Sequence, residues 1–194
     1  MKKKISVLVV LMLVLCLTSC ISTELPEENL PDVPVEAPVD EPVEEPIEPD
    51  EPKFVEKEII LYFPDKDALY LHKEVRTVQV AENENLEMVV LRELFKGPER
   101  EDLAPSLTGE DLVRSSVVYD GGDCLVDFKS DFVLLNTGGS ARETFAIASI
   151  VNSLCELDYV EKVAFTVDNK SNVEFGHFII DPYMSPMTEL VKPE

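Results

Sequence analysis

"CLVDFKSDFVLLNTGGSARETFAIASIVNSL", residues 124–154, changes its apolar period partway along, and this change decides the fold class. Its first residues alternate, with Cys124, Val126 and Phe128 on one face, which is typical of a half-buried strand. After the glycine pair at 138–139, apolar and small side chains recur at helical spacing. These are Thr144, Ile147, Ala148, Val151 and Leu154. A strand followed by a helix predicts a mixed fold in which the helix packs on a sheet.

The start of this helix carries a capping signal. The residues SARE at 140–143 match a capping box, in which Ser140 caps the helix and Glu143 reaches back toward the cap. The glycines before it allow a second interpretation, because free N–H groups at a helix N-terminus can hold an anion. We interpret the motif as a cap and keep the anion site as the alternative.

A hairpin precedes the strand at 124–128. Residues 112–119 and 124–128 flank the turn DGGD at 120–123. Glycine at both central positions accepts the positive φ that a tight hairpin turn requires. The aspartates lack the ligand spacing of a calcium-binding loop, so we interpret the motif as a turn.

Four further segments complete the domain. Residues 58–63 predict a strand that stops at Pro64, residues 69–80 a second strand, and residues 160–168 and 173–180 two more. The apolar members expected in the second strand are Leu69, Leu71, Val75, Val78 and Val80.

Residues 86–96 predict a helix. Asn83 or Asn85 can cap its start, and Gly97 followed by Pro98 ends it. The predicted fold class is therefore α+β: a single domain of five or six short strands with two helices packed on the sheet.

The N-terminus predicts a lipoprotein signal. Three lysines at 2–4 precede an apolar run at 5–17, the pattern of a secretory signal. The run has about 13 residues, whereas a membrane-spanning helix needs roughly 20, so a permanent span is disfavoured. LTSC at 17–20 resembles the bacterial lipobox, which implies a signal peptide at 1–19, lipid on Cys20 and a place on the extracytoplasmic face of the bacterial cell membrane.

Residues 20–53 predict an acidic, proline-rich tether. Eight of the 14 prolines and 12 of the 39 acidic residues lie here. Proline prevents helix and sheet, and the chain favours a disordered, extended form that reaches up to roughly 100 Å. The alternative is a proline-rich ligand for a partner domain. The predicted organisation is a signal at 1–19, a tether at 20–53, a folded domain at 54–185 and a tail at 186–194.

Charge and residue types exclude several function classes. From residue 54 onward there are 27 acidic and 13 basic side chains, a net charge of −14, so nucleic acid is not an expected partner. A Cys-His site would need Cys124 or Cys155 with His177, and neither His72 nor His177 lies in a nucleophile motif. A paired-carboxylate glycosidase stays open but lacks tryptophan for a sugar cleft.

We therefore expect no enzyme activity, no cofactor and no metal site. The chain has no Cys-x-x-Cys or His-x-x-x-His spacing for zinc. We expect His72 to be solvated, and Cys124 and Cys155 to be free thiols, because buried cysteine is an ordinary small apolar residue.

Several short motifs, in this order and spacing, resemble the GerMN domain of sporulation and spore germination. They are YF at 62–63, LFKGP at 94–98, VDFKSDF at 126–132, GG at 138–139, IVNSL at 150–154 and VEKV at 160–163. The resemblance runs from about 59 to 180, with Asn169 where the family usually has glycine. It implies an envelope domain related to ring-building motifs of spore assembly machines, and no known reaction.

Two function classes follow. The first is a non-catalytic, membrane-anchored lipoprotein that docks another envelope protein, in sporulation or germination. The alternative is an extracytoplasmic binding module for a small molecule or a cell-wall fragment. An open sheet edge or apolar patch would favour the first, and an apolar pocket with convergent polar groups the second.

Overall fold

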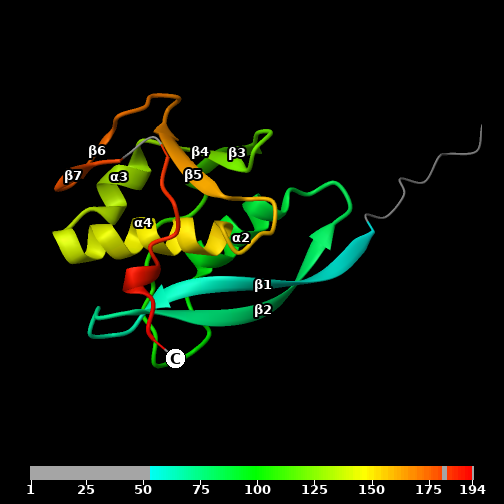
Figure 1. The fold of residues 1–194 in the computed structure, drawn as a ribbon, viewed down its shortest axis with the longest axis horizontal. Helices are drawn as coiled ribbons and strands as arrows, with labels where there is room; N and C mark the ends of the chain where they lie inside the picture. The colour runs from blue at the N-terminus through cyan, green and yellow to red at the C-terminus, as the bar shows by residue number, and fades with distance from the viewer. Residues whose placement is uncertain (1–52, 181–182, 194) are drawn as a thin grey trace, which may run out of the picture. The chain divides into compact units, whose positions relative to one another are not determined.

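The structure, a computed structural model, describes residues 53–180 and 183–193. The predicted signal, the tether and Cys20 lie outside the described residues. The described part is an α+β domain, as predicted (Figure 1). Its elements are β1 (Phe54–Pro64), β2 (Leu71–Ala81), α2 (Leu86–Lys96), β3 (Val113–Val118), β4 (Asp123–Phe128), α3 (Asp131–Asn136), α4 (Ser140–Leu154), β5 (Lys162–Val167), β6 (Glu174–Phe175), β7 (Phe178–Ile179) and a 3-10 turn (Thr188–Leu190).

Helices α2 and α4 lie between two sheets (Figure 1). On one side is the antiparallel hairpin β1–β2, and on the other a three-stranded sheet in the order β3-β4-β5. The larger of two hydrophobic clusters joins β1, α2, β4, α4 and β5, and a smaller one contains Tyr62, Leu71, Phe145 and Ala148. Because α4 is covered from both sides, its residues from Phe145 to Leu154 are all buried, and not only the one predicted face.

The hairpin predicted at 112–128 is confirmed, and a parallel partner is added to it. Strand β3 pairs antiparallel with β4, and Gly121 and Gly122 in the turn have φ of 98° and 82°. Strand β5 then pairs parallel with β4, so α3 and α4 form the crossover between them. Cys124, Val126 and Phe128 face the core as the alternation predicted.

In β2 the structure corrects the expected pattern. Val75 is 55% exposed, whereas Glu74 and Arg76 are buried, on the same face as Val78 and Val80. Alternation allows only one of these two sets to face inward. Glu74 and Arg76 can be buried because α2 and the loop after it supply partners for both charges, as described below.

Two further differences concern short elements. Helix α3 was not predicted, because six residues are too few to show a helical period. The strand expected at 173–180 is two two-residue strands around Gly176, which has φ of 61°. Asn169 has φ of 59°, a left-handed conformation that asparagine tolerates.

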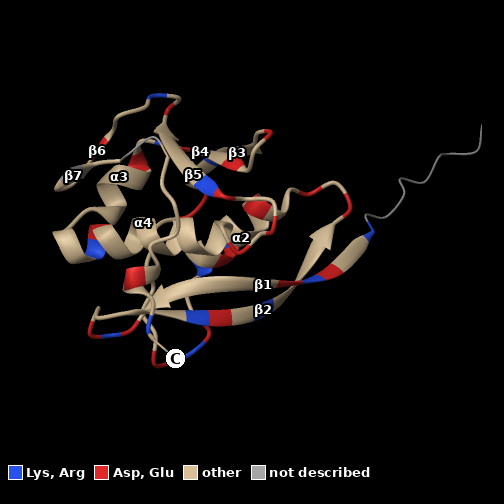
Figure 2. Ribbon diagram, viewed as in Figure 1, with Lys and Arg blue, Asp and Glu red and all other residues tan. Residues whose placement is uncertain are grey.

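Charged side chains are mixed over the described domain. Figure 2 shows Lys and Arg scattered among Asp and Glu, with no continuous basic face in that view. Among the described residues, none of the helices has the length and apolar character that crossing a bilayer would require.

Candidate functional site

The N-terminus of α4 is organised by one buried carboxylate, that of Glu143, which is 1% exposed. It accepts hydrogen bonds from the N–H groups of Gly138 at 3.0 Å and Gly139 at 3.1 Å. It also accepts the N–H of His177 at 2.9 Å, and Nδ1 of His177 lies 2.8 Å from Oε2. Glu143 therefore ties the start of α4 to the turn between β6 and β7.

These donors keep Glu143 ionised. The N–H of Gly138 lowers its pKa first of all, burial opposes this, and the His177 contacts and Gly139 lower it further, to about 2. Because a carboxylate only accepts, the proton of the shared bond is on Nδ1 of His177. The predicted capping residue is corrected: Gly139 is the N-cap, and the side chain of Ser140 makes no cap hydrogen bond. Glu143 does reach back as the motif predicted.

Gly176 is required at this site. A Cβ at this position would lie 2.1 Å from the Glu143 carboxylate, and its φ of 61° disfavours other residues. The turn between β6 and β7 therefore approaches α4 as closely as it does only because residue 176 has no side chain.

A pocket, here called the α4 pocket, lies on the outer side of the same helix terminus and has a volume of about 480 Å³. Its polar lining consists of Asp65, Lys66, Ser106, Ser140 and Arg142. Its apolar walls are Pro64, Ala68, Ala104, Pro105 and Phe145, and the backbone of 138–141 completes it. A guanidinium N–H of Arg142 donates to the hydroxyl of Thr108 at 2.9 Å.

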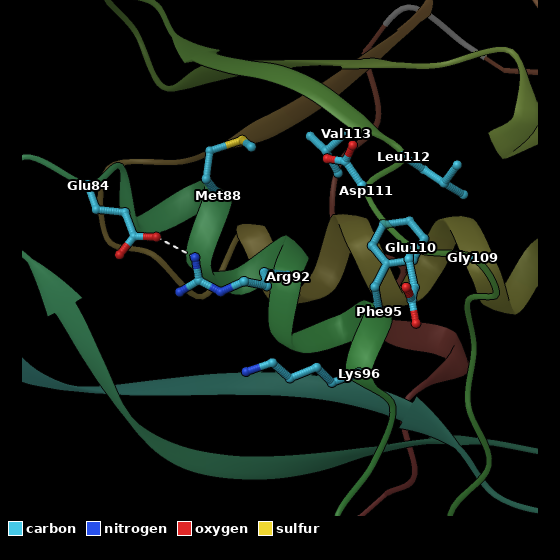
Figure 3. A pocket seen from close by; sticks show the side chains of 10 residues that line it. All are labelled: Glu84, Met88, Arg92, Phe95, Lys96, Gly109, Glu110, Asp111, Leu112 and Val113. Atoms are coloured by element: carbon cyan, nitrogen blue, oxygen red, sulfur yellow. Dashed lines mark hydrogen bonds and ion pairs between the residues drawn. The ribbon is translucent and has the colours of Figure 1, made fainter.

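A larger groove, here called the α2 groove, lies between α2 and the segment 109–113 and has a volume of about 590 Å³. Figure 3 shows Met88 and Phe95 on the side of α2 that faces this segment. With Leu112 they give the groove its apolar lining. The α2 wall carries Arg92 and Lys96, and the opposite wall carries Glu110 and Asp111.

Both cations of the α2 wall, Arg92 and Lys96, already contact a nearby carboxylate. Arg92 pairs with Glu84, and Lys96 Nζ lies 2.5 Å from an oxygen of Glu93. Across the groove, Asp111 pairs with Lys129 at 2.6 Å. The groove therefore has walls of opposite sign, each partly balanced and exposed to solvent.

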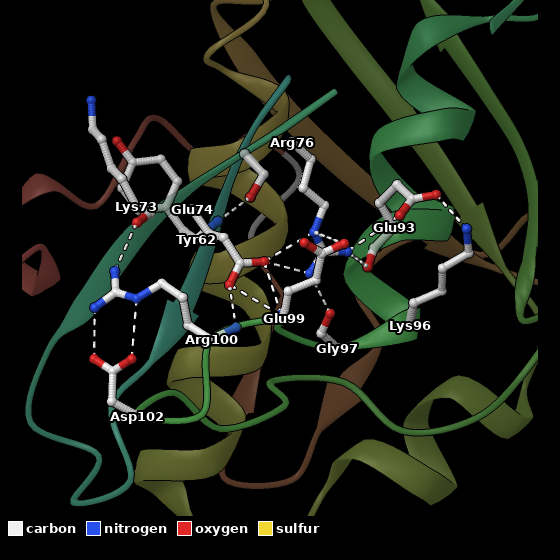
Figure 4. A network of polar contacts seen from close by, with 11 residues as sticks. Tyr62, Lys73, Glu74, Arg76, Glu93, Lys96, Gly97, Glu99, Arg100 and Asp102 are labelled. Carbon is white, nitrogen blue, oxygen red and sulfur yellow. Dashed lines mark hydrogen bonds and ion pairs between the residues drawn. The ribbon is translucent and has the colours of Figure 1, made fainter. Parts of the chain in front are cut away.

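A buried ionic network centred on Arg76 joins β2 to α2 and to the loop after α2 (Figure 4). Its guanidinium lies 2.5 Å from Glu74 and 3.2 Å from Glu93, and donates to the carbonyl of Gly97 at 2.6 Å. Glu74 also accepts the N–H groups of Glu99 and Arg100. Burial alone would raise the pKa of Glu74, but these two N–H groups and Arg76 lower it overall.

The other sequence candidates are His72 and the two cysteines. His72 is not solvated as expected: its side chain is 15% exposed and Nε2 lies 3.5 Å from Asp65, because the β1–β2 turn folds Asp65 back over β2. Burial raises the pKa of the Cys124 thiol to about 12 and that of Cys155 to about 11. Both thiols are free in the structure.

The capping motif in the sequence pointed to Glu143 as a site residue, but no sequence pattern pointed to its partner His177. His177 bonds Glu143, not a cysteine, and the described residues hold no cluster of three metal-ligating side chains. No sequence pattern marked Arg142 or Ser106 as a site residue. The only signal for Arg76 was that charged residues interrupt the apolar alternation of β2.

The described residues form a small α+β domain that carries the α2 groove and the α4 pocket, and both of its histidines contact carboxylates. A family model described as sporulation and spore germination (Germane) matches residues 60–173, and the chain belongs to this family. This agrees with the resemblance found in the motifs.

Solved structures agree in fold. The first GerMN domain of the sporulation protein GerM from Bacillus subtilis is 18% identical with a TM-score of 0.54, and the match covers 66% of this chain and 97% of that one. The tandem GerMN domains of the same protein give the same identity and TM-score, over 69% of this chain and 46% of that one. This chain thus spans less than half of the tandem structure. No curated protein matches the chain.

Proposed function

We propose that this chain is a non-catalytic lipoprotein of the bacterial cell envelope that docks another envelope protein in sporulation or germination. Cys20 carries the lipid on the extracytoplasmic face, and residues 20–53 tether the domain. Membership of the sporulation and spore germination family supports the process. The α2 groove is the observation that carries the docking role.

The groove suits a polypeptide segment. Its lining of Met88, Phe95 and Leu112 can take apolar side chains, and methionine adapts its shape to a partner. Walls of opposite charge favour a segment that carries both signs, and they fix its orientation. The described domain is strongly acidic, so paired walls here also reduce repulsion of an acidic partner.

The reactive groups support a non-catalytic role. The thiols of Cys124 and Cys155 have raised pKa values, so neither is a ready nucleophile at neutral pH. His177 Nδ1 is engaged by Glu143 and His72 faces Asp65, so neither imidazole lies beside a cysteine as a general base.

Site-specific crosslinking in membranes tests the docking. A photo-crosslinking amino acid at Lys96, in the groove, should give one adduct that mass spectrometry identifies as an envelope protein. The same amino acid at Lys57, exposed on β1, is the matched control and should give none. Arg92→Glu should abolish the Lys96 adduct, and Lys57→Glu should not. Equal adducts from both positions, or none from Lys96, would contradict the proposal.

The anchor is tested separately. Cys20→Ser should abolish palmitate labelling and leave an uncut precursor, because the thiol is the acyl acceptor. Normal labelling of that variant would exclude the lipoprotein assignment.

A second candidate function is an extracytoplasmic binding module for a small molecule or wall fragment. The α4 pocket favours it, because apolar walls there meet convergent polar groups.

A further inference from the structure

We propose that β2 is an interaction surface for a second copy of this chain, and that the β2 strands of two copies pair antiparallel about Thr77. The inference goes beyond docking at the α2 groove, whose lining contains no residue of β2.

The first support is the open edge of β2. The sheet β1–β2 has two strands, so each strand pairs on one side only. In Figure 1, β2 is the outer strand of this hairpin, because β1 lies between it and α4. An unpaired strand edge presents a row of N–H and C=O groups that can pair with another chain.

The register shows which residues of β2 face this edge. In an antiparallel pair, the backbone groups of successive residues alternate between the partner strand and the other side. The N–H of Glu82 donates to the carbonyl of Lys53 across the hairpin at 3.1 Å. The even-numbered residues of β2 therefore bond β1, and the odd-numbered residues direct their backbone groups to the open edge.

Both ends of this edge are already occupied. At the start, the carbonyl of Lys73 accepts a guanidinium N–H of Arg100 at 3.3 Å. At the end, the N–H of Ala81 donates to the side chain of Glu84 at 3.4 Å, and the carbonyl of Ala81 accepts the N–H of Glu84 at 2.9 Å. An added strand can therefore pair only with the residues between these two positions.

The remaining open stretch is symmetric. The outward residues between the two ends are Val75, Thr77 and Gln79, and all three are exposed. Their backbone groups have no hydrogen-bond partner among the described residues. Because Thr77 is at the centre, a second copy running antiparallel matches the stretch completely: Val75 faces Gln79 of the other copy, and Thr77 faces Thr77.

Charge distinguishes this edge from that of β1. The outward residues of β1 include Glu56 and Glu58, which are exposed. Two β1 edges paired about Lys57 would place Glu56 opposite Glu58 of the other copy, and like charges opposite each other destabilise a strand pair. The outward residues of the β2 stretch carry no charge, so β2 lacks the protection that charged side chains give to an edge.

Charge also favours the antiparallel direction. Lys73, with its side chain 51% exposed, lies before the open stretch, and the exposed Glu82 lies after it. Antiparallel pairing brings the basic end of each copy to the acidic end of the other, whereas parallel pairing would bring like charges together. Lys73 already contacts Glu156 at 3.0 Å, so these charges select the direction and add little affinity.

The dimer is expected to be weak. Pairing of two short edges buries less surface than the roughly 1,600 Å² of a standard interface. The net charge of −14 from residue 54 onward also makes two copies repel each other. The test must therefore trap the dimer.

Cysteine crosslinking of the full chain in membranes tests the inference. With copper–phenanthroline as oxidant, Thr77→Cys should give a disulfide-linked dimer, because residues of a hydrogen-bonded pair have Cα atoms about 5.5 Å apart, within disulfide range. Glu58→Cys is the matched control, because Glu58 lies opposite Thr77 in the hairpin and is also exposed. It should give no dimer above the background of the unsubstituted chain.

Two further measurements test the register. A mixture of differently tagged Val75→Cys and Gln79→Cys chains should crosslink to each other, whereas Val75→Cys alone should not. Adding Thr77→Lys to both chains of the mixture should lower the crosslinked fraction by about threefold or more, because like charges then meet at the axis. Glu58→Gln, which changes the net charge by the same amount, should not lower it. An unchanged melting temperature of the Thr77→Lys chain shows that the fold is kept.

Four results would each overturn the proposal: no dimer from Thr77→Cys, equal dimers from Thr77→Cys and Glu58→Cys, crosslinking of Val75→Cys alone as strong as in the mixture, or no effect of Thr77→Lys. The photo-crosslink at Lys96 should be unchanged in the Thr77→Lys chain, because no residue of β2 lines the α2 groove. Docking at the groove and pairing of β2 can therefore fail independently.

Discussion

Two of the buried carboxylates among the described residues, Glu74 and Glu143, are held in different ways. Glu74, 6% exposed, faces the guanidinium of Arg76 and two backbone N–H groups. Glu143, 1% exposed, has no full positive charge beside it except when His177 is protonated, and accepts three backbone N–H groups and the imidazole. Both have lowered pKa values.

The comparison shows two ways in which a protein interior can keep a carboxylate ionised. One is a counter-charge, and the other is a set of backbone N–H dipoles that point at the carboxylate. The first arrangement buries a second charge, which becomes a liability if its partner is removed. The second depends on backbone geometry, and so on glycines that let the backbone approach. The two sites should therefore respond to different kinds of substitution.

The largest effect is expected for Arg76→Met. Glu74 and Glu93 then lose their shared cation, and breaking a buried pair costs about 3 kcal/mol of unfolding free energy. The value lies at the low end of such losses because Glu74 keeps the N–H groups of Glu99 and Arg100. Urea unfolding measures it.

Arg92→Met is the control for that variant. Arg92 is an exposed arginine that pairs with Glu84, so its loss should change the free energy by less than about 1 kcal/mol. A similar cost for both variants would show that the Arg76 network is not special.

Gly176→Ala should disturb the dipole-held site next most strongly. The new Cβ meets the Glu143 carboxylate and the residue keeps a positive φ. Gly121→Ala is the matched control for Gly176→Ala. Gly121 has φ of 98°, and a Cβ added there would have no atom within 4 Å. This variant should therefore lose only about 1 kcal/mol of unfolding free energy, from backbone strain. Thermal unfolding should rank Gly176→Ala as clearly worse. Equal losses would mean that the close approach to Glu143 does not matter.

Glu143→Gln should have a smaller effect that depends on pH. The folded pKa is about 2 and the reference value is 4.5, so the charged form stabilises the fold fully above pH 4.5. This contribution is lost as the pH falls from 4.5 toward 2. Urea unfolding of both proteins should therefore show a gap at neutral pH that closes in acid. A gap that widens in acid would contradict the assignment.

The two cysteines contrast with these carboxylates, because burial keeps their thiols neutral. Raised pKa values predict slow alkylation of native Cys124 and Cys155 by iodoacetamide at neutral pH. In urea without reductant, peptide mapping should find both alkylated. If alkylation needed prior reduction, the two would be bridged.

The fold class followed from the sequence because apolar period and turn residues are local. The helix at 86–96 and the turn at 120–123 were predicted because Gly97, Gly121 and Gly122 take the positive φ that those positions need. The parallel pairing of β4 with β5 could not be predicted in the same way, because it depends on where α4 packs.

The candidate sites were less predictable. In β2, apolar residues change parity between Leu71 and Val78, so the choice of Val75 or Arg76 for the inward face depended on partners in α2. The capping motif identified Glu143, but His177 lies 34 residues further along the chain. Such contacts become visible only when the tertiary structure places the elements together.

The parallel pair has a consequence for the order of folding. Strands β1 and β2 are joined by a short turn and can pair locally, with Pro64 opposite Leu71. Strand β4 meets β5 with Asp123 opposite Lys162, so the intervening chain must first be ordered. Because closing a long loop slows folding, we expect the hairpin β1–β2 to form early and the β4–β5 pairing to limit the rate. Val163→Ala should then slow refolding more than Val78→Ala for the same loss of stability.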